Sequence, residues 1–217
     1  MFIIVIYHFS NINNILINIY DMLTISFDIG VVNLGVCILN DNQIILWETK
    51  QLFEKANKAR DINTITRRIY EVMDEMMEEL GKVLDGNDDY KVDYVLLENQ
   101  PSRINGKMKT IQMILYGYFY NLKHYHKKVI NIHHVNPTCK LAWVNDIERD
   151  GLSKYEQYKQ NKTKSVHICK DIADGKERLQ DMLKNAGSKK DDMCDALIQI
   201  IGFQKKNKIN IDIDVII

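Results

Sequence analysis

The chain has 217 residues, of which 46% are hydrophobic and 27% charged, a balance typical of one folded domain and too apolar for a disordered chain. Its 29 basic and 29 acidic residues cancel, and its four cysteines include no Cys-x-x-Cys pair, which argues against a zinc finger or disulfide framework and fits a reducing compartment inside the cell. Neither histidine pair, at 124/126 or at 133/134, has partners at metal-ligand spacing.

The first 21 residues form an apolar, asparagine-rich stretch without a charge before Asp21. This stretch lacks the basic segment of a signal peptide, and its asparagines recur too often for a membrane span. We therefore expect residues 1–21 to be an extension outside the fold or the result of a misassigned start, residues 22–205 to form one domain and residues 206–217 to be a tail, with no contact to a membrane. The alternation in the tail, "INIDIDVII", is typical of an edge strand.

Three short apolar runs follow the extension, at Leu23–Asp28, Leu34–Leu39 and Gln43–Trp47. Gly30 and the sequence "NDN" at 40–42 separate them, so the runs predict three sequential antiparallel strands joined by tight turns. Apolar residues at steps of three and four then predict a helix: Ile62, Ile65, Ile69, Val72, Met76 and Leu80.

The second half of the chain alternates between strand and helix patterns. Continuous apolar runs at 92–98 and 128–135 predict two strands that are covered on both faces. The helical pattern between them has these apolar positions: Met108, Ile111, Leu115, Tyr118 and Leu122. Residues 137–187 are polar and expected to be helical in pieces, and Asp191–Phe203 predicts a final helix. The fold class is therefore α/β, with a mixed five-stranded sheet, antiparallel in its first three strands and parallel afterwards, flanked by helices.

The zero net charge hides a strong asymmetry along the chain. Residues 61–98 contain eleven acidic and four basic side chains, whereas residues 99–170 contain thirteen basic and four acidic ones. A block this basic indicates a surface that binds a polyanion. On charge alone, a solvated lysine-rich surface explains the block equally well.

Four carboxylates occupy positions from which their side chains could meet at one site. Asp28 closes the first strand, Glu98 closes the central one, and the last helix opens with Asp192 and Asp195 three residues apart on one face. If the two strands are parallel neighbours, both strand-end acids emerge at one edge of the sheet, where the helix can deliver the other pair. Each acid alone also has an ordinary explanation, as a residue favoured by the helix dipole or as a surface residue at a strand end.

Four neighbouring carboxylates repel one another unless a cation neutralises them. Mg²⁺ prefers oxygen ligands, and two such ions about 4 Å apart can clamp the attacking water and the leaving oxygen of a phosphodiester. The pattern therefore predicts a site for two Mg²⁺ ions, with Mn²⁺ able to substitute.

Three motifs resemble the RuvC-like Holliday junction resolvases of the RNase H-like superfamily, over roughly residues 22–203. They are "FDIGVVNLGVCIL" with Asp28, "VLLENQPSR" with Glu98 and "KKDDMCDAL" with Asp192 and Asp195. The Asn-Leu pair after the first aspartate, the Gln-x-x-Arg after Glu98 and the basic "YKQNKTKSV" are similar to the poxvirus-like viral resolvases and their fungal mitochondrial relatives. Asp-Ile-Gly stands where bacterial members usually have Asp-Pro-Gly, which argues against the bacterial branch.

The resemblance implies an RNase H-like fold and a homodimer that binds a four-way DNA junction and cuts two opposing strands symmetrically. Asp28, Glu98, Asp192 and Asp195 would be catalytic and hold Mg²⁺, and water would attack in line to leave a 5′-phosphate and a 3′-hydroxyl. No nucleotide cofactor is expected. The implied location is intracellular, at a cytoplasmic site of viral replication if the protein is viral, in preference to the mitochondrion or nucleus.

The same resemblance gives the basic block a role in binding DNA phosphates. Such contacts determine how tightly and where the protein binds, and they do not read the base sequence. The residues expected to contact DNA are Gln100, Arg103, Lys107, Lys109, Lys140, Lys159, Lys162 and Lys164. The family also places a basic residue near the scissile phosphate to offset transition-state charge, and Lys140, Lys162 and Lys164 remain candidates for it. The aromatic helix at 106–124 is expected to pack on the sheet, and part of it would suit a dimer interface.

Three other functions compete with this one. An RNase H-like nuclease could instead act on flaps, other branched DNA or RNA–DNA hybrids, since dimer geometry reads substrate shape. "FDIGVVNLG" also resembles the first phosphate loop of actin-like ATPases, but the chain has only ten glycines and no second copy of the motif. A module that binds nucleic acid without cutting it would be indicated by a missing acid, and all four acids are present.

Overall fold

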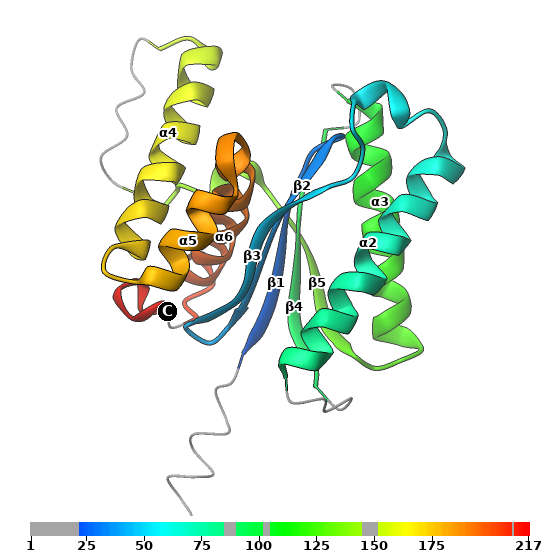
Figure 1. The fold of residues 1–217 in the computed structure, drawn as a ribbon, viewed down its shortest axis with the longest axis horizontal. Coiled ribbons are helices and arrows are strands. Elements are labelled where there is room, and N and C mark those ends of the chain that lie inside the picture. The colour runs from blue at the N-terminus through cyan, green and yellow to red at the C-terminus, as the bar shows by residue number, and fades with distance from the viewer. Residues whose placement is uncertain (1–21, 85–89, 102–104, 145–151, 210) are drawn as a thin grey trace, which may run out of the picture.

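Five strands form one mixed sheet in the order β3-β2-β1-β4-β5 (Figure 1). Their bounds are β1 (Leu23–Ile29), β2 (Asn33–Asn40), β3 (Gln43–Gln51), β4 (Val92–Glu98) and β5 (Val129–Val135). β1 pairs antiparallel with β2 and β2 antiparallel with β3, whereas β4 runs parallel to both β1 and β5. The predicted mixed sheet and its strand directions are confirmed.

The structure is a computed structural model that describes residues 22–84, 90–101, 105–144, 152–209 and 211–217. The extension expected at residues 1–21 and the DNA contact expected at Arg103 lie outside these ranges.

Two layers of helices cover the two faces of the sheet (Figure 1). On one face lie α2 (Ile62–Val83) and α3 (Gly106–His124). On the other face lie α4 (Lys154–Ala173), α5 (Glu177–Asn185) and α6 (Lys190–Lys206). The sheet is therefore buried on both sides, which explains why β4 reads as a continuous apolar run.

Local sequence signals account for where the helices begin. Asp61 caps α2 by accepting a hydrogen bond from the Thr64 amide, and Asn105 caps α3 in the same way. Ser153 and Glu156 form a reciprocal capping box at the start of α4. The polar segment that was expected to be helical in pieces contains α4, α5 and a short 3₁₀ turn at Pro137–Cys139.

Two hydrophobic cores hold the layers together. The core under α2 and α3 includes Phe27 and Phe119, whose ring centroids lie 5.5 Å apart. The core under α6 includes Trp47 and Leu197, and nearly every residue of α6 beyond its first turn is buried. Helix α6 is therefore the best-anchored helix of its layer, which matters because it carries two of the four acids.

The residues after α6 fold back onto the second core. Ile216 is fully buried there, and the backbone of Ile217 accepts a 2.7 Å hydrogen bond from Ile44 of β3 and donates a 2.8 Å hydrogen bond to Asn42 in the turn before β3. The alternating pattern of this segment predicted an edge strand, and this prediction is wrong. The segment contains a 3₁₀ turn at Ile213–Val215 instead.

All four cysteines are buried free thiols. Within the described ranges, no helix has both the length and the apolar character needed to cross a bilayer.

Candidate active site

The strand-end acids lie side by side because β1 and β4 are parallel neighbours. Phe27 is in register with Leu97, so Asp28 and Glu98 are the next residues at the same edge of the sheet. Their side chains are only 15% and 13% exposed. The expectation that both acids emerge at one edge is confirmed.

A glycine on β2 allows α6 to bring its acids to this edge. Gly35 is paired with Asp28 across β1 and β2. A Cβ atom at Gly35 would lie 2.1 Å from the carbonyl oxygen of Asp192 and 2.5 Å from its carbonyl carbon. Since no Cβ fits at that distance, only glycine permits the first turn of α6 to rest directly on β2.

Buried polar groups fix the position of α6 further. The Gln199 amide nitrogen lies 3.0 Å from the Ser26 hydroxyl and 3.3 Å from each of the Phe27 and Leu96 carbonyls, so one side chain joins α6 to both β1 and β4. The Trp47 indole donates a 2.7 Å hydrogen bond to the Met193 carbonyl, which joins α6 to β3. A helix held at these points cannot slide along the sheet without losing several buried hydrogen bonds.

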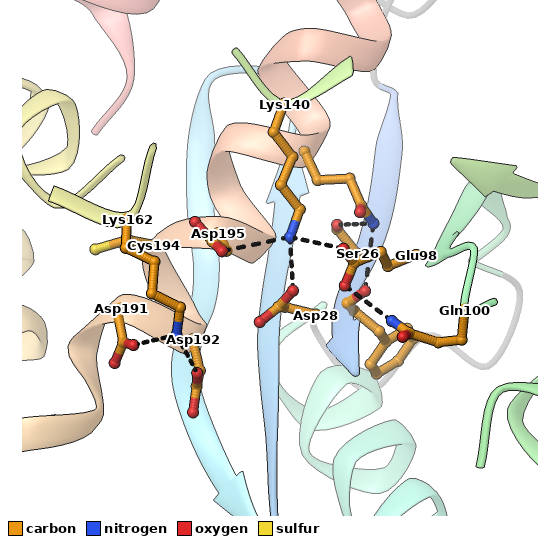
Figure 2. A network of polar contacts seen from close by, with 12 residues as sticks. Ser26, Asp28, Glu98, Gln100, Lys140, Lys162, Asp191, Asp192, Cys194 and Asp195 are labelled. Atoms are coloured by element: carbon orange, nitrogen blue, oxygen red, sulfur yellow. Dashed lines mark hydrogen bonds and ion pairs between the residues drawn. The ribbon is translucent and has the colours of Figure 1, made fainter. Parts of the chain in front are cut away.

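One lysine occupies the centre of the acids, as Figure 2 shows. Lys140 follows the 3₁₀ turn after β5, and its ammonium lies 2.6 Å from Asp28 Oδ1, 3.4 Å from Glu98 Oε1 and 3.4 Å from Asp195 Oδ2. The lysine side chain is 9% exposed. Three carboxylates from β1, β4 and α6 thus surround a single buried cation.

The protonation of these acids reflects burial together with this cation. Burial opposes the charged form of Asp28, but the Lys140 ammonium and a hydrogen bond from Glu98 outweigh it and lower the pKa of Asp28. Burial raises the pKa of Glu98 to about 8, and it raises the pKa of Asp195 as well, although Lys140 acts in the opposite direction on both. Burial lowers the pKa of Lys140, but its three carboxylate neighbours more than reverse the effect and hold it well above its usual value.

A second ammonium lies at the start of α6 (Figure 2). Lys162 of α4 is 2.5 Å from Asp191 Oδ2 and 3.8 Å from Asp192 Oδ1. Burial and the neighbouring Asp191 raise the pKa of Asp192 to about 6. Asp192 therefore belongs to the same acidic edge but pairs with a different lysine from the other three acids.

The residues present fit a hard divalent cation. As they stand, no three Asp, Glu, His or Cys side chains of the described residues are arranged to hold a metal ion. The donor set nevertheless consists of carboxylate oxygens alone, and three of these carboxylates already converge on one positive charge, the Lys140 ammonium. Oxygen donors gathered around a cation are the ligands that Mg²⁺ prefers.

Two of the acids, Glu98 and Asp195, line a cavity of about 240 Å³ between the sheet edge and α4. Glu98, Asp195 and Lys140 form one side of it. The α4 residues that line it are Gln157, Tyr158, Asn161, Lys162 and Ser165. The site is therefore a narrow, charged cleft that can admit a phosphodiester.

The remaining residues predicted to contact DNA fall into two groups. Gln100 is 7% exposed, and its amide donates a 3.0 Å hydrogen bond to Glu98 Oε2, so it supports an acid instead of lying on an open surface. The others lie further out. Lys109 donates to the buried Gln112, Lys107 donates to the Ala56 carbonyl, and Lys159 and Lys164 lie along α4.

Three polar residues that the sequence analysis did not single out also support the site. Gln199 is described above. Gln112 is fully buried on α3 and accepts a hydrogen bond from the Gln100 backbone amide, and Ser165 of α4 hydrogen-bonds Asp195. An amide on the apolar face of a helix is the sequence signal that could have found both glutamines, because most buried amides make hydrogen bonds.

Comparisons with known proteins agree with this geometry. Residues 22–204 match the model of the family described as Poxvirus A22 protein. A protein of Acanthamoeba polyphaga mimivirus, the uncharacterized protein L451, is 30% identical over 117 residues, which cover 50% of this chain and 28% of that relative's length.

Two solved structures share the fold. The Fowlpox virus resolvase in complex with Holliday junction DNA is 19% identical, with a TM-score of 0.52 over 86% of this chain and 99% of that one. The yeast mitochondrial Holliday junction resolvase Ydc2 is 16% identical, with a TM-score of 0.54 over 88% of this chain and 84% of that one. The chain thus belongs to the poxvirus A22 protein family, and its RNase H-like α/β fold is that of Holliday junction resolvases.

Proposed function

We propose that this protein is a metal-dependent endodeoxyribonuclease that resolves four-way DNA junctions by paired nicks. The observation that carries the proposal is the convergence of Asp28, Glu98 and Asp195, from three separate elements, on one buried cation. Membership of the poxvirus A22 family and the resolvase fold support the same reaction. They also support a viral protein that acts on viral DNA inside the infected cell.

Asp28, Glu98, Asp192 and Asp195 would hold two Mg²⁺ ions, and Mn²⁺ could replace them. Bound divalent ions supply a polarised scissile phosphate and a water that is acidic enough to attack it. The chain's part is to hold the four carboxylates at fixed spacing, which Gly35 and Gln199 accomplish by seating α6 on the sheet. Gln100 orients Glu98 from the side through its amide.

Lys140 is the lysine best placed to act on the scissile phosphate. Its ammonium lies among the acids, whereas Lys162 is paired with Asp191. Lys164 lies on α4 and has no ion pair in the described part of the chain. We assign Lys140 the role of offsetting the negative charge that develops on the phosphate in the transition state. Binding of divalent ions to the acids would release its ammonium for this role.

The substrate would reach the acids across the basic surfaces of α3 and α4. Lys107 and Lys109 lie in the first turn of α3, and Lys159 and Lys164 lie on α4. Ammonium groups on both sides of the cleft suit the phosphate backbones of junction arms, which they would bind without reading sequence.

Two cuts in opposing strands require two active sites, so we propose a homodimer. Exposed apolar side chains on α3 and β5 support this proposal. Met113 and Tyr120 on α3 are 49% and 44% exposed, and Ile130 on the edge strand β5 is 44% exposed. Burial of such side chains in a dimer would remove them from water.

Cleavage of synthetic DNA tests the proposal directly. Labelled four-way junctions should be nicked symmetrically with Mg²⁺ and left intact with EDTA, while linear duplex of the same sequence should resist cutting. Asp28→Asn and Asp195→Asn should each reduce cutting by at least about a thousandfold, because each removes a ligand charge, yet leave junction binding unchanged. Equal cutting of linear duplex, or preferential cutting of flaps or RNA–DNA hybrids in the same gel, would refute junction resolution.

A further inference from the structure

The main chain that carries Lys140 rests directly on α6. A Cβ atom at Gly202 of α6 would lie 2.2 Å from the carbonyl oxygen of Cys139 and 3.2 Å from that of Lys140. No Cβ fits at the shorter distance, so only glycine lets the two main chains meet there. Gly202 lies two helical turns beyond Asp195, so the face of α6 that supports the main chain of Lys140 also carries the acid that its ammonium contacts.

Trp143 binds the same piece of main chain. Its indole donates a 2.9 Å hydrogen bond to the Lys140 carbonyl, and the Lys140 amide donates a 3.3 Å hydrogen bond to the Pro137 carbonyl. The indole ring is held to α6 in turn, because the ammonium of Lys205 lies over it at 5.3 Å from its centroid. Both polar main-chain groups of Lys140 are therefore hydrogen-bonded.

The hold on the main chain matters most when the acids have bound divalent ions. In the structure, three carboxylates attract the Lys140 ammonium and keep its side chain in place (Figure 2). Bound divalent ions would neutralise these carboxylates and weaken that attraction. A lysine side chain is a flexible four-carbon stem, so the position of its main chain then decides where the ammonium can reach.

We propose that Gly202 and Trp143 are positioning residues that hold Lys140 beside the scissile phosphate. Gly202 sets how closely the main chain of the lysine approaches α6, and Trp143 fixes the carbonyl next to its side chain. Both residues act through Lys140, whose part in cutting belongs to the proposed function, and the inference rests on that function.

Chemical labelling tests the hold without requiring catalysis. The full-length protein in EDTA is treated with a trace of acetic anhydride, and mass spectrometry compares acetylation of Lys140 with that of Lys82, whose side chain is 70% exposed. In the wild type Lys140 should be labelled slowly, because its side chain is 9% exposed and ion-paired. Trp143→Phe should speed this labelling at least about threefold and Gly202→Ala at least about fivefold, because each loosens the segment.

The chain offers a matched control for each variant. The indole of Trp47 also donates to a main-chain carbonyl, that of Met193, so Trp47→Phe removes an equivalent bond that does not involve the Lys140 segment. Gly117→Ala adds a methyl group inside helix α3, where a Cβ atom has no neighbour within 4 Å. Both controls should leave the labelling of Lys140 within about twofold of the wild type.

Two labelling results would overturn the proposal. If Trp143→Phe and Gly202→Ala left Lys140 as protected as in the wild type, these residues would not hold it. If the control variants accelerated labelling as much as the test variants, the effect would be a general loosening of the protein.

Single-turnover cutting in saturating Mg²⁺ tests whether the hold serves the reaction. Trp143→Phe should slow the cutting of a four-way junction about fivefold, the effect of one hydrogen bond, and leave junction affinity within about twofold. In a Lys140→Met background, which should retain only slow cutting, Trp143→Phe should cause no further loss, because its effect passes through the ammonium.

The same fivefold loss in both backgrounds would overturn a role exerted through Lys140. A wild-type protein that cut no junction would refute the proposed function separately, since the labelling would still decide whether Gly202 and Trp143 hold the lysine in place.

Discussion

Replacement of Lys140 by methionine separates the charge of the buried lysine from its bulk. Methionine keeps most of the volume of the side chain, so the change removes mainly the ammonium that lies within 3.4 Å of Asp28, Glu98 and Asp195. In the metal-free protein, these three acids then face one another without a compensating charge.

The expected cost follows from the geometry. Removal of one partner from a buried ion pair typically costs about 3–5 kcal/mol. The lower end applies here, because the pKa of Glu98 is already raised to about 8 and this acid is largely protonated at neutral pH. A loss of about 3 kcal/mol in a chain of this size corresponds to a fall in Tm of about 6–12 °C.

Thermal denaturation with and without Mg²⁺ provides the assay. In EDTA, Lys140→Met should melt about 6–12 °C below the wild type, whereas saturating Mg²⁺ should close most of this gap by replacing the missing charge. Lys107→Met is the matched control, because the Lys107 ammonium lies at an exposed position, where it donates to the Ala56 carbonyl and to no other atom of the residues that the structure describes. That variant should melt within about 2 °C of the wild type in both buffers.

Two results would refute this reasoning. If Lys140→Met were as stable as the wild type in EDTA, the ammonium would not be compensating the acids. If Mg²⁺ stabilised the variant no more than the wild type, the carboxylates around Lys140 would not be the metal ligands.

Three further predictions concern other parts of the molecule. Gly35→Ala should cost about 1–3 kcal/mol in urea denaturation and lower the cutting rate, because its new methyl group would displace α6 from β2. Trp47→Phe should cost about 1–2 kcal/mol by the same measurement, since it removes the indole hydrogen bond to α6. Lys159→Gln and Lys164→Gln should each reduce by about one the slope of log K against log salt for junction binding, measured by fluorescence anisotropy.

Controls for these predictions come from the chain itself. Gly106→Ala should change stability by less than about 1 kcal/mol, because a Cβ atom there has no neighbour within 4 Å. An equal loss at Gly35 and Gly106 would contradict a specific contact between β2 and α6. A salt slope unchanged by either lysine variant would place the DNA away from α4.

The strands, the helices and the meeting of the acids could be predicted from sequence because local signals specify them. Runs of apolar residues indicate buried strands, and apolar residues at steps of three and four indicate helices with one buried face. When two neighbouring parallel strands each end in an acid, both acids must emerge at the same edge of the sheet. The expectation that Asp28 lies beside Glu98 followed from this rule. The structure confirms it through the register of β1 and β4.

The lysine at the centre of the site could not be chosen from sequence. Lys140 is separated by 112 residues from Asp28, its nearest carboxylate, and it directly follows a short 3₁₀ turn with no periodic pattern. From charge alone, Lys162 and Lys164 were equally good candidates for the basic residue near the scissile phosphate. Burial distinguishes the three lysines, and it depends on how α4 packs against α6, which the sequence does not show. Gln100 was expected on the DNA surface for a similar reason, since nothing local shows that it turns inward to Glu98.

The contact between Gly35 and the first turn of α6 ties the spacing of the acids to a single position on β2. This contact joins main chain to main chain, so no neighbouring side chain can shrink to make room for a larger residue there. The position should therefore stay glycine in every protein that keeps these four acids together, because any side chain there would separate the strand-end acids from those of α6.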